Sequence, residues 1–460
     1  MMQTKRILIA GIVLILLIVA TIITVGLLPR DEDNNIVSPA WVVSIQEEQV
    51  SAIEVTNRNG SYRATFDNGV SIQGLENYPL SDNTLTHMRA AVGSIYAYDT
   101  IDRSGKDLGK YGFSSPTATA IVTDTDGKQF HFTVGSLMPN GSAYYVMKDD
   151  HTVYAVSSEY LTFVLADAQS FISKQITAIP ADTAYLVDYL TITKNGQPYL
   201  KIVAMDDTES VHQNSTGVFK MLYPYQGLGG DANIVDYLNT LCNLTATTVQ
   251  HLGTDPEALA QYGLTQPAIV VEYAYRGEVK QLYFSEPIDG FCNVYTKDST
   301  IIYSILAQKI KLIRFDGMDF LTPYQFERDI NEVERIVLST HTGDNYTYNV
   351  KVTGGKTTAS LGSTPVNGDA FERFYDLLTT SEIIGVAQKP STRPTLSMTF
   401  RYYASTGKAN DTVHFYPMDD HTYFLEINGQ GNFYVSSLYV DKVFECIAKL
   451  NNGQDFSIRY

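Results

Sequence analysis

Three stretches of the chain alternate apolar and polar residues on either side of turn dipeptides, as the strands of a half-buried sheet do. They cover residues 51–72, 189–203 and 335–360, and each contains an Asn-Gly or Gly-Gly pair. These dipeptides supply the positive φ angles that tight hairpins require. The pattern therefore predicts one hairpin in each third of the chain.

Each hairpin is followed by a proline and then by a segment whose apolar residues recur every three or four positions. Asp82, Asp231 and Asn367 stand at the expected starts, where their side chains can accept hydrogen bonds from free backbone amides. The spacing predicts three amphipathic helices that pack against the sheets. The apolar stripes are Leu85, Met88, Val92 and Ile95; Ile234, Leu238, Leu241 and Cys242; and Phe371, Phe374, Tyr375 and Leu378.

A short motif follows the first two of these helices. Residues 108–116 read LGKYGFSSP, and residues 259–267 read LAQYGLTQP. We interpret both as helix-to-strand connections in which Gly takes a positive φ and Pro begins a strand. The last third keeps Pro394 but has no Tyr-Gly. A structural motif tolerates that loss better than a catalytic one, so we expect the motif to be structural.

Alternating strands after the motif predict a three-strand meander in each third, with a closing helix in the first and the last. The predicted fold class is α+β, with an N-terminal transmembrane helix followed by three tandem repeats of antiparallel sheet with packing helices. The predicted boundaries are a cytoplasmic tip at 1–6, a transmembrane signal anchor at 7–28, a linker at 29–45, and repeat units at 46–180, 181–330 and 331–460.

The membrane prediction depends on residues 7–28, which carry no charge. As a helix this run is about 33 Å long, enough to cross the hydrocarbon of a bilayer. Lys5 and Arg6 precede the run, which places the N-terminus in the cytoplasm and the bulk of the chain outside. The alternative is a cleaved signal peptide, but the run exceeds the usual signal core of about 7–15 residues and ends without a small-x-small site. We expect a single-pass cell-membrane protein that contacts the lipid bilayer through residues 7–28.

The charge and composition of the chain exclude some classes of partner and indicate what fills its cores. The formal net charge is −17, which argues against nucleic acid and against electrostatic binding to anionic lipid. Tyr occurs 32 times and Trp once, and 44% of residues are hydrophobic, which suits sheets with real cores. Cys242, Cys292 and Cys446 cannot all pair within one chain, and their apolar contexts predict buried free thiols.

The order of these motifs resembles a bacterial domain-of-unknown-function family, the one numbered 4340. The resemblance covers about residues 45–330 and rests on 108–116 with the following TATAIVTDTDGKQFHFTVG, on AYYVMKDDHTVYAVSSEYL, and on 259–267 with IVVEYAYRGEVKQLYFSE. Members of that family are commonly associated with ABC-2-type exporters, including auxiliary components of the gliding-motility transporter. The resemblance therefore implies an extracytoplasmic transporter accessory with an ABC permease as its membrane partner, and it provides no catalytic residues.

The chain offers little in the way of catalytic or ligand-binding motifs. Residues 352–358, VTGGKTT, contain the end of a phosphate loop, but Val350 stands where that loop requires Gly. The tetrapeptide DDHT occurs at 149–152 and at 419–422, in different turns of the two predicted meanders. We interpret both as turn chemistry rather than as a cation site. The sequence therefore predicts no catalytic residue, no metal and no cofactor.

One segment stands out as a possible contact surface. Residues 206–230 form a long polar insertion in which Phe219, Tyr223 and Tyr225 could anchor a partner, or else pack back onto their own unit. We expect a non-enzymatic scaffold or accessory of a transporter or envelope complex. A cell-wall polysaccharide-binding module is the alternative, and it requires exposed coplanar tyrosines. A hydrolase ranks last, because it requires two carboxyl groups about 5–10 Å apart and no pair is indicated.

Overall fold

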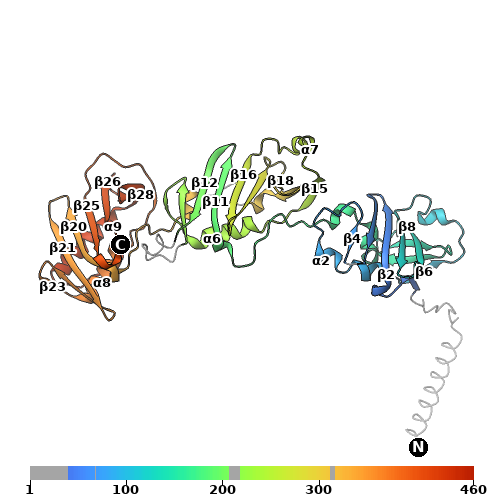
Figure 1. Cartoon of the computed structure of the whole chain (residues 1–460), viewed down its shortest axis with the longest axis horizontal. Coiled ribbons are helices and arrows are strands. Elements are labelled where there is room, and N and C mark those ends of the chain that lie inside the picture. Colours follow the sequence, from blue (N-terminus) through green and yellow to red (C-terminus); the bar gives the residue numbers. More distant parts are fainter. Residues whose placement is uncertain (1–39, 68, 207–217, 311–315) are drawn as a thin grey trace, which may run out of the picture. The chain divides into compact units, whose positions relative to one another are not determined.

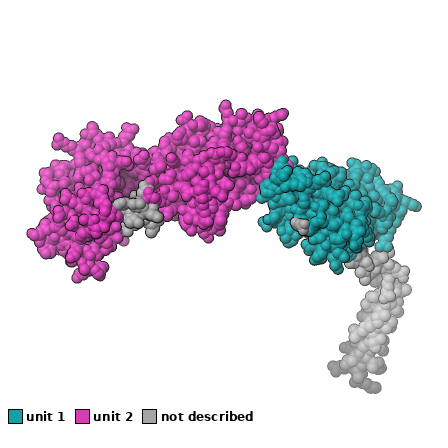
Figure 2. Space-filling model, in the orientation of Figure 1, with its two compact units in different colours: residues 1–173 teal, residues 174–460 magenta. Residues whose placement is uncertain are grey.

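The structure is a computed structural model that describes residues 40–67, 69–206, 218–310 and 316–460. The chain forms two compact units, residues 1–173 and 174–460 (Figure 2). The predicted tip at 1–6, the anchor at 7–28 and the linker up to residue 39 lie outside the described residues. Within the described part of the chain, no helix combines the length and the apolar character needed to cross a membrane.

The described residues form four antiparallel sheets with short helices, so the fold is dominated by sheet (Figure 1). The first unit contains a two-stranded ribbon of β1 (Ala40–Ser44) and β5 (Ser94–Ala97), and an eight-stranded sheet in the order β4-β3-β2-β7-β8-β9-β10-β6. The strands of that sheet are β2 (Val50–Asn57), β3 (Gly60–Thr65), β4 (Ser71–Ile72), β6 (Asp99–Asp102), β7 (Ala118–Asp124), β8 (Gln129–Leu137), β9 (Ala143–Lys148) and β10 (Val153–Ser157).

The second unit contains two nine-stranded sheets. The second sheet has the order β14-β13-β12-β11-β16-β17-β18-β19-β15. Its strands are β11 (Val187–Lys194), β12 (Gln197–Ala204), β13 (Phe219–Tyr223), β14 (Gly227–Leu228), β15 (Thr248–Leu252), β16 (Ile269–Tyr275), β17 (Glu278–Phe284), β18 (Phe291–Thr296) and β19 (Ile301–Leu306).

The third sheet has the order β23-β22-β21-β20-β25-β26-β27-β28-β24. Its strands are β20 (Val333–Thr340), β21 (Asn345–Thr353), β22 (Lys356–Leu361), β23 (Thr364–Val366), β24 (Gly385–Val386), β25 (Leu396–Tyr402), β26 (Asp411–Pro417), β27 (Thr422–Ile427) and β28 (Gln430–Ser436).

The second and third sheets share one strand order, and the first large sheet has the same order without the outermost strand that β14 and β23 provide. In each, a hairpin strand pairs with the first strand of a meander (β2 with β7, β11 with β16, β20 with β25), and a strand that precedes the meander in the chain closes its far edge (β6, β15, β24). The meanders have four strands, one more than predicted, because the strand after each connecting segment joins the hairpin. The closing edge strands were not predicted, since β24 and its counterparts are short and weakly patterned.

Helices cover the sheets largely where the apolar stripes predict them. The second predicted helix is α6 (Asp231–Cys242), and the third is α8 (Gly368–Thr379), whose N-cap Asn367 accepts a hydrogen bond from the Ala370 amide. The predicted stripes of both helices are buried. The last helix, α9 (Ser437–Asn451), is capped by Ser436.

The first predicted helix is wrong in its extent. It is divided into α2 (Asp82–Leu85) and α3 (Met88–Gly93), and Ile95 lies in strand β5. The Thr86 hydroxyl donates to the Asp82 carbonyl at 2.6 Å, a local bond that competes with helix propagation. A Cβ on Gly93 would lie 2.8 Å from Val50, so this position requires glycine where the helix end meets the sheet.

The two Tyr-Gly connections adopt the predicted conformation. The first contains the 3₁₀ turn η2 (Leu108–Tyr111) and Gly112 at φ 87°, and the second contains α7 (Pro256–Gln261) and Gly263 at φ 68°. The buried Tyr111 donates its hydroxyl to Asp102 at 2.9 Å, and Tyr262 donates to the carbonyl of Gln250 at 3.2 Å. Both tyrosines thus join the connection to the strand that closes the meander edge.

Candidate partner-binding site

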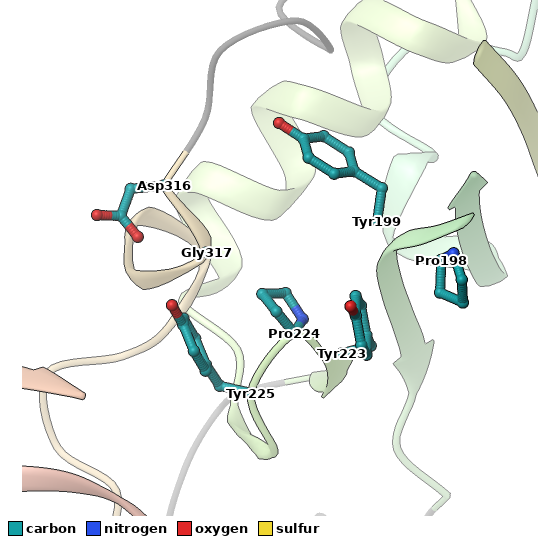
Figure 3. Close-up of a pocket in the computed structure, with 7 residues that line it drawn as sticks. All are labelled: Pro198, Tyr199, Tyr223, Pro224, Tyr225, Asp316 and Gly317. Atoms are coloured by element: carbon teal, nitrogen blue, oxygen red, sulfur yellow. The ribbon is translucent and has the colours of Figure 1, made fainter. Parts of the chain in front are cut away.

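An open pocket of about 580 Å³ lies in the second unit, beside the second sheet (Figure 3). Strand β12 contributes two of its residues, the end of β13 contributes one, the segment between β13 and β14 contributes two, and the start of the 3₁₀ helix η8 (Gly317–Phe320) contributes the rest. The lining residues are Pro198, Tyr199, Tyr223, Pro224, Tyr225, Asp316 and Gly317. We call this set the Tyr–Pro pocket.

Close packing shapes one wall of the Tyr–Pro pocket. Figure 3 shows Pro224 between the rings of Tyr223 and Tyr225, with the Asp316–Gly317 turn beside them. A Cβ on Gly317 would lie 2.8 Å from Pro224 and 3.0 Å from the Tyr225 ring. Glycine at this position therefore allows the turn to approach both side chains.

The hairpin that carries the pocket is held by the buried side chain of Gln325. Its Oε1 accepts from the Leu228 amide at 2.7 Å, and its Nε2 donates to the carbonyls of Leu228 at 3.2 Å and Thr322 at 2.6 Å. The Thr322 amide in turn donates to the Leu228 carbonyl at 3.0 Å. Because these bonds satisfy a short edge strand that has few ladder partners, they fix β14 and the segment before it.

The described lining residues are mainly aromatic rings and prolines. Three aromatic rings and two prolines offer apolar faces, and the tyrosine hydroxyls offer donors and acceptors. The one carboxylate among them, Asp316, caps η8 by accepting from the Met318 amide at 3.0 Å. A tyrosine-rich surface with an engaged carboxylate suits recognition of a partner more than proton transfer.

The structure separates the three residues predicted to contact a partner. Phe219 is 1% exposed and begins β13 on the face that packs into the core, which is the second of the two outcomes that the sequence allows for it. Tyr223 is 43% exposed and Tyr225 is half-buried, and both line the Tyr–Pro pocket. Tyr225 also meets the edge of Phe433 with ring centroids 6.3 Å apart.

Pro198 and Tyr199 also line the pocket, although no pattern in the sequence indicates them. Both belong to β12, which reads as an ordinary hairpin strand. The pairing of Lys201 with Tyr223 brings β12 next to β13 and so places Tyr199 beside the predicted residues. Lys201 and Tyr223 lie far apart in the sequence, so the local pattern of apolar and polar residues does not indicate that they pair.

A polar row on the third sheet was also missed. Ser397, His414 and Glu426 are cross-strand neighbours on β25, β26 and β27, with Ser397 Oγ 2.8 Å from His414 Nδ1. Burial and the nearby Lys389 lower the pKa of His414, against the opposing charge of Glu426. The Glu426 carboxylate is bound by Lys389 and by the Tyr416 hydroxyl. Its oxygens are therefore occupied by partners other than the imidazole.

Acidic residues gather at a second pocket, of about 530 Å³, whose lining includes Glu327, Asp329, Glu372 and Asp376. Burial raises the pKa of Glu327, and burial together with the charge of Glu372 raises the pKa of Asp376. Nowhere in the described part of the chain do three or more His, Cys, Asp or Glu side chains come together as a metal site would require.

The two DDHT segments occupy the turns that the pattern predicts, between β9 and β10 and between β26 and β27. Asp150 accepts from the Thr152 amide at 3.0 Å, and Asp419 accepts from the His421 amide at 2.8 Å. Both aspartates therefore stabilise turns, at positions that are not equivalent in the two meanders.

The three cysteines are buried free thiols, as predicted. Burial raises the pKa of Cys242 to about 12, and burial with a nearby glutamate raises the pKa of Cys292 and of Cys446 to about 11. Because the thiolate is the reactive form, these residues are packing groups.

One known family resembles part of this chain. Residues 71–226 match the model described as Domain of unknown function (DUF4340). The chain is therefore similar to the DUF4340 family over this region, as its motifs predict. The match begins at strand β4 and ends one residue after Tyr225, so it is shorter than the resemblance predicted over 45–330 and stops before the second Tyr-Gly connection. Searches of curated proteins and of solved structures found no match.

Proposed function

We propose that this protein is a non-enzymatic, membrane-anchored accessory on the outer face of the cell membrane, acting in an ABC-2-type transporter or another envelope complex. Three copies of one sheet-and-helix unit form its extracytoplasmic part. The uncharged run at 7–28 anchors it, and the permease is its membrane partner. An anchored protein meets such a partner at high local concentration, so a modest interface is sufficient.

The Tyr–Pro pocket is the observation that carries this proposal. Exposed Tyr and neighbouring apolar groups are typical of the centre of protein interfaces. Tyr223 and Tyr225 lie inside the DUF4340 region, whereas Asp316 and Gly317 come from beyond it. The shared strand order of the three sheets supports the triplication, because an unrelated arrangement would not place equivalent strands next to each other three times.

A site-specific photo-crosslinker tests this proposal directly. We would replace Tyr223 by a photoreactive phenylalanine derivative in cells, irradiate membranes and identify the cross-linked protein. The matched control is Tyr185, which is 52% exposed in the same unit but does not line the pocket. We expect a permease adduct from position 223 and none from position 185. Equal labelling from the two positions, or a protein unrelated to transport, would contradict the proposal.

A polysaccharide-binding function is the second candidate, because two tyrosines stack in parallel on the second sheet. The rings of Tyr283 and Tyr295 lie 4.8 Å apart at an interplanar angle of 16°, and both side chains are partly exposed. Such a platform can stack against sugar rings. Co-sedimentation with isolated cell-wall sacculi tests it: Tyr295→Ala should release the protein if the platform binds, while Tyr185→Ala should not.

A further inference from the structure

Aromatic side chains gather on the outer face of the β1–β5 ribbon in the first unit. Trp41 and Tyr96 are cross-strand partners whose rings meet edge to face at 5.3 Å, and the ring of Tyr160 follows at 6.0 Å from Tyr96. Trp41 is 47% exposed and Tyr160 is 38% exposed. We call these three residues the ribbon aromatic cluster.

The ribbon itself does not need these rings for its packing. Its inner face buries Val42 and Val43 from β1 and Ile95 and Ala97 from β5, each at 3% exposure or less. A bulge between Trp41 and Val43 lets both valines point inward. The core is therefore filled from one face of the ribbon, and the aromatic face is left to solvent.

The chain that precedes the ribbon indicates what covers this face. The uncharged run ends at Leu28 and β1 begins at Ala40, so 11 residues connect them. Even fully extended, that segment spans only about 40 Å. The polar interface zone of a bilayer is about 5–8 Å thick on each side, and Trp and Tyr are the residues enriched there. Trp41, the single tryptophan of the chain, lies next to the end of this tether.

We infer that the ribbon aromatic cluster rests in the headgroup zone of the bilayer and holds the first unit against the membrane surface. This inference rests on the proposed anchoring through residues 7–28. It adds a second, peripheral lipid contact made by the folded part of the chain. Aromatic rings suit that zone because their apolar bodies leave water while their N–H and O–H groups keep polar partners.

The charged residues near the cluster indicate whether it binds lipid through electrostatic attraction or through its aromatic rings. The Lys148 ammonium donates to the Trp41 carbonyl at 3.4 Å, and the exposed Glu159 precedes Tyr160 in the chain. One cation beside one carboxylate gives little net attraction to an anionic surface. The contact is therefore aromatic partitioning, and it should occur on zwitterionic phosphatidylcholine and change little with salt.

The test uses the fluorescence of Trp41 in the full-length protein reconstituted into phosphatidylcholine vesicles. Lipids brominated near the headgroup or near the chain end act as quenchers at two depths, and aqueous iodide reports on exposure to solvent. We expect a blue-shifted emission, strong quenching by the shallow bromines, weaker quenching by the deep ones and weak quenching by iodide.

Two variants separate this contact from general proximity to the membrane. In the first, Trp41→Phe with Ser61→Trp moves the probe to β3, on the side of the sheet away from β10, and its emission should be quenched by iodide and not by bromines. In the second, Tyr160→Ser removes an exposed ring and should reduce the quenching of Trp41 by shallow bromines. Because Ser61 and Tyr160 are both exposed, neither change disturbs the core.

Extraction of the same membranes with alkaline carbonate distinguishes failure of this inference from failure of the proposed anchoring. Protein that stays with the membrane while Trp41 is quenched only by iodide overturns the inference and leaves the anchor intact. Trp41 shielded from both quenchers also overturns it, in favour of a protein partner. Release of the full-length protein by carbonate overturns the anchoring and, with it, the inference.

Discussion

At the scale of single residues, tyrosine has two separate roles in this protein. Tyr348 and Tyr439 are fully buried, and their hydroxyls donate to Asn451 Oδ1 at 2.8 Å and to the Leu377 carbonyl at 3.1 Å. Tyr223, by contrast, is exposed at the pocket. Composition alone shows the abundance of tyrosine but not this division, because burial depends on the partner strand. The many buried rings weaken the polysaccharide alternative, which requires tyrosines at the surface.

A buried ion pair leads to the first prediction. Arg328 donates to Asp411 Oδ2 at 2.6 Å, with side-chain exposures of 8% and 13%, and Tyr402 and Asn428 also donate to this carboxylate. Asp411→Asn leaves the guanidinium buried without its counter-charge. We expect the third sheet to lose about 3–5 kcal/mol of local stability. Hydrogen exchange of peptides from β25 and β26 at pH 7 measures this loss.

The same pair makes stability depend on pH. Burial alone would raise the pKa of Asp411, but the hydrogen bond and charge of Arg328 outweigh it and lower this pKa. A lowered pKa in the folded state stabilises the fold above the unfolded value of about 3.9, and the contribution is lost as the pH falls through the folded pKa. The exposed pair Glu54–Arg63 is the control, since Glu54→Gln should cost less than about 1 kcal/mol. Similar losses for Asp411→Asn and Glu54→Gln would contradict the prediction.

At the scale of elements, the repeated Tyr-Gly connection provides a matched comparison. Gly112 and Gly263 both have positive φ, but their surroundings differ. A Cβ on Gly112 would lie 2.0 Å from Ser136 Oγ and 2.7 Å from the Ser136 amide nitrogen, whereas at Gly263 the nearest atom is Ser285 Cβ at 3.7 Å. Backbone strain is common to both positions, and steric overlap is found at one.

We therefore expect Gly263→Ala to destabilise its unit by about 1–2 kcal/mol, the cost of a left-handed alanine. Gly112→Ala should cost clearly more, because the steric overlap adds to that strain. Thermal unfolding of the two variants measures the difference. If both alanines cost the same, then Ser136 moves aside freely and the first connection is less tightly packed than the structure shows.

The elements also show where sequence reasoning succeeds and where it fails. The turns at Asn195-Gly196 and Gly354-Gly355 have the positive φ angles that their dipeptides predict, and α6 and α8 follow their apolar stripes. These features depend on local conformation and periodicity. Strand β24 and the divided first helix depend instead on distant contacts, such as the pairing of Gly385 with Tyr434. For the same reason, the sequence indicates only Tyr223 and Tyr225 among the residues that line the Tyr–Pro pocket.

The hairpin that carries the Tyr–Pro pocket leads to a third prediction. Gln325→Leu keeps the size of the side chain but leaves the Leu228 amide without its acceptor. An unsatisfied buried amide costs about 1–3 kcal/mol, so β13 and β14 should exchange hydrogen faster while the meander is unchanged. Peptide-resolved hydrogen exchange measures the exchange rates of these two strands and of the meander. Gln325→Glu, which keeps an acceptor for the amide, should have the smaller effect, and the opposite ranking would contradict the role assigned to Gln325.

At the scale of the whole molecule, the order of elements was easier to predict than the extent of each sheet. Three hairpins, three helices and three meanders are visible in the pattern because each recurs at a similar distance along the chain. The pairing of each hairpin with its meander was not predicted. The strands that join them, β2 with β7, β11 with β16 and β20 with β25, lie far apart in the sequence. The family match crosses from the first sheet into the second, so its boundaries differ from those of the sheets.

The division into two compact units predicts that they unfold as separate transitions. Each unit has its own core, and chains of several domains seldom unfold in one step. Trp41, the single tryptophan, belongs to the first unit, so its fluorescence follows that unit, whereas far-ultraviolet circular dichroism follows both. In the full-length protein in detergent, Asp411→Asn should lower the midpoint of part of the dichroism transition and leave the Trp41 midpoint unchanged. Gly112→Ala should lower the Trp41 midpoint together with the part of the dichroism transition that belongs to the first unit, since a Cβ at Gly112 would overlap Ser136 in the unit of Trp41. If Asp411→Asn also lowers the Trp41 midpoint, or Gly112→Ala lowers the whole dichroism transition, the units are coupled in folding and the chain behaves as one cooperative body.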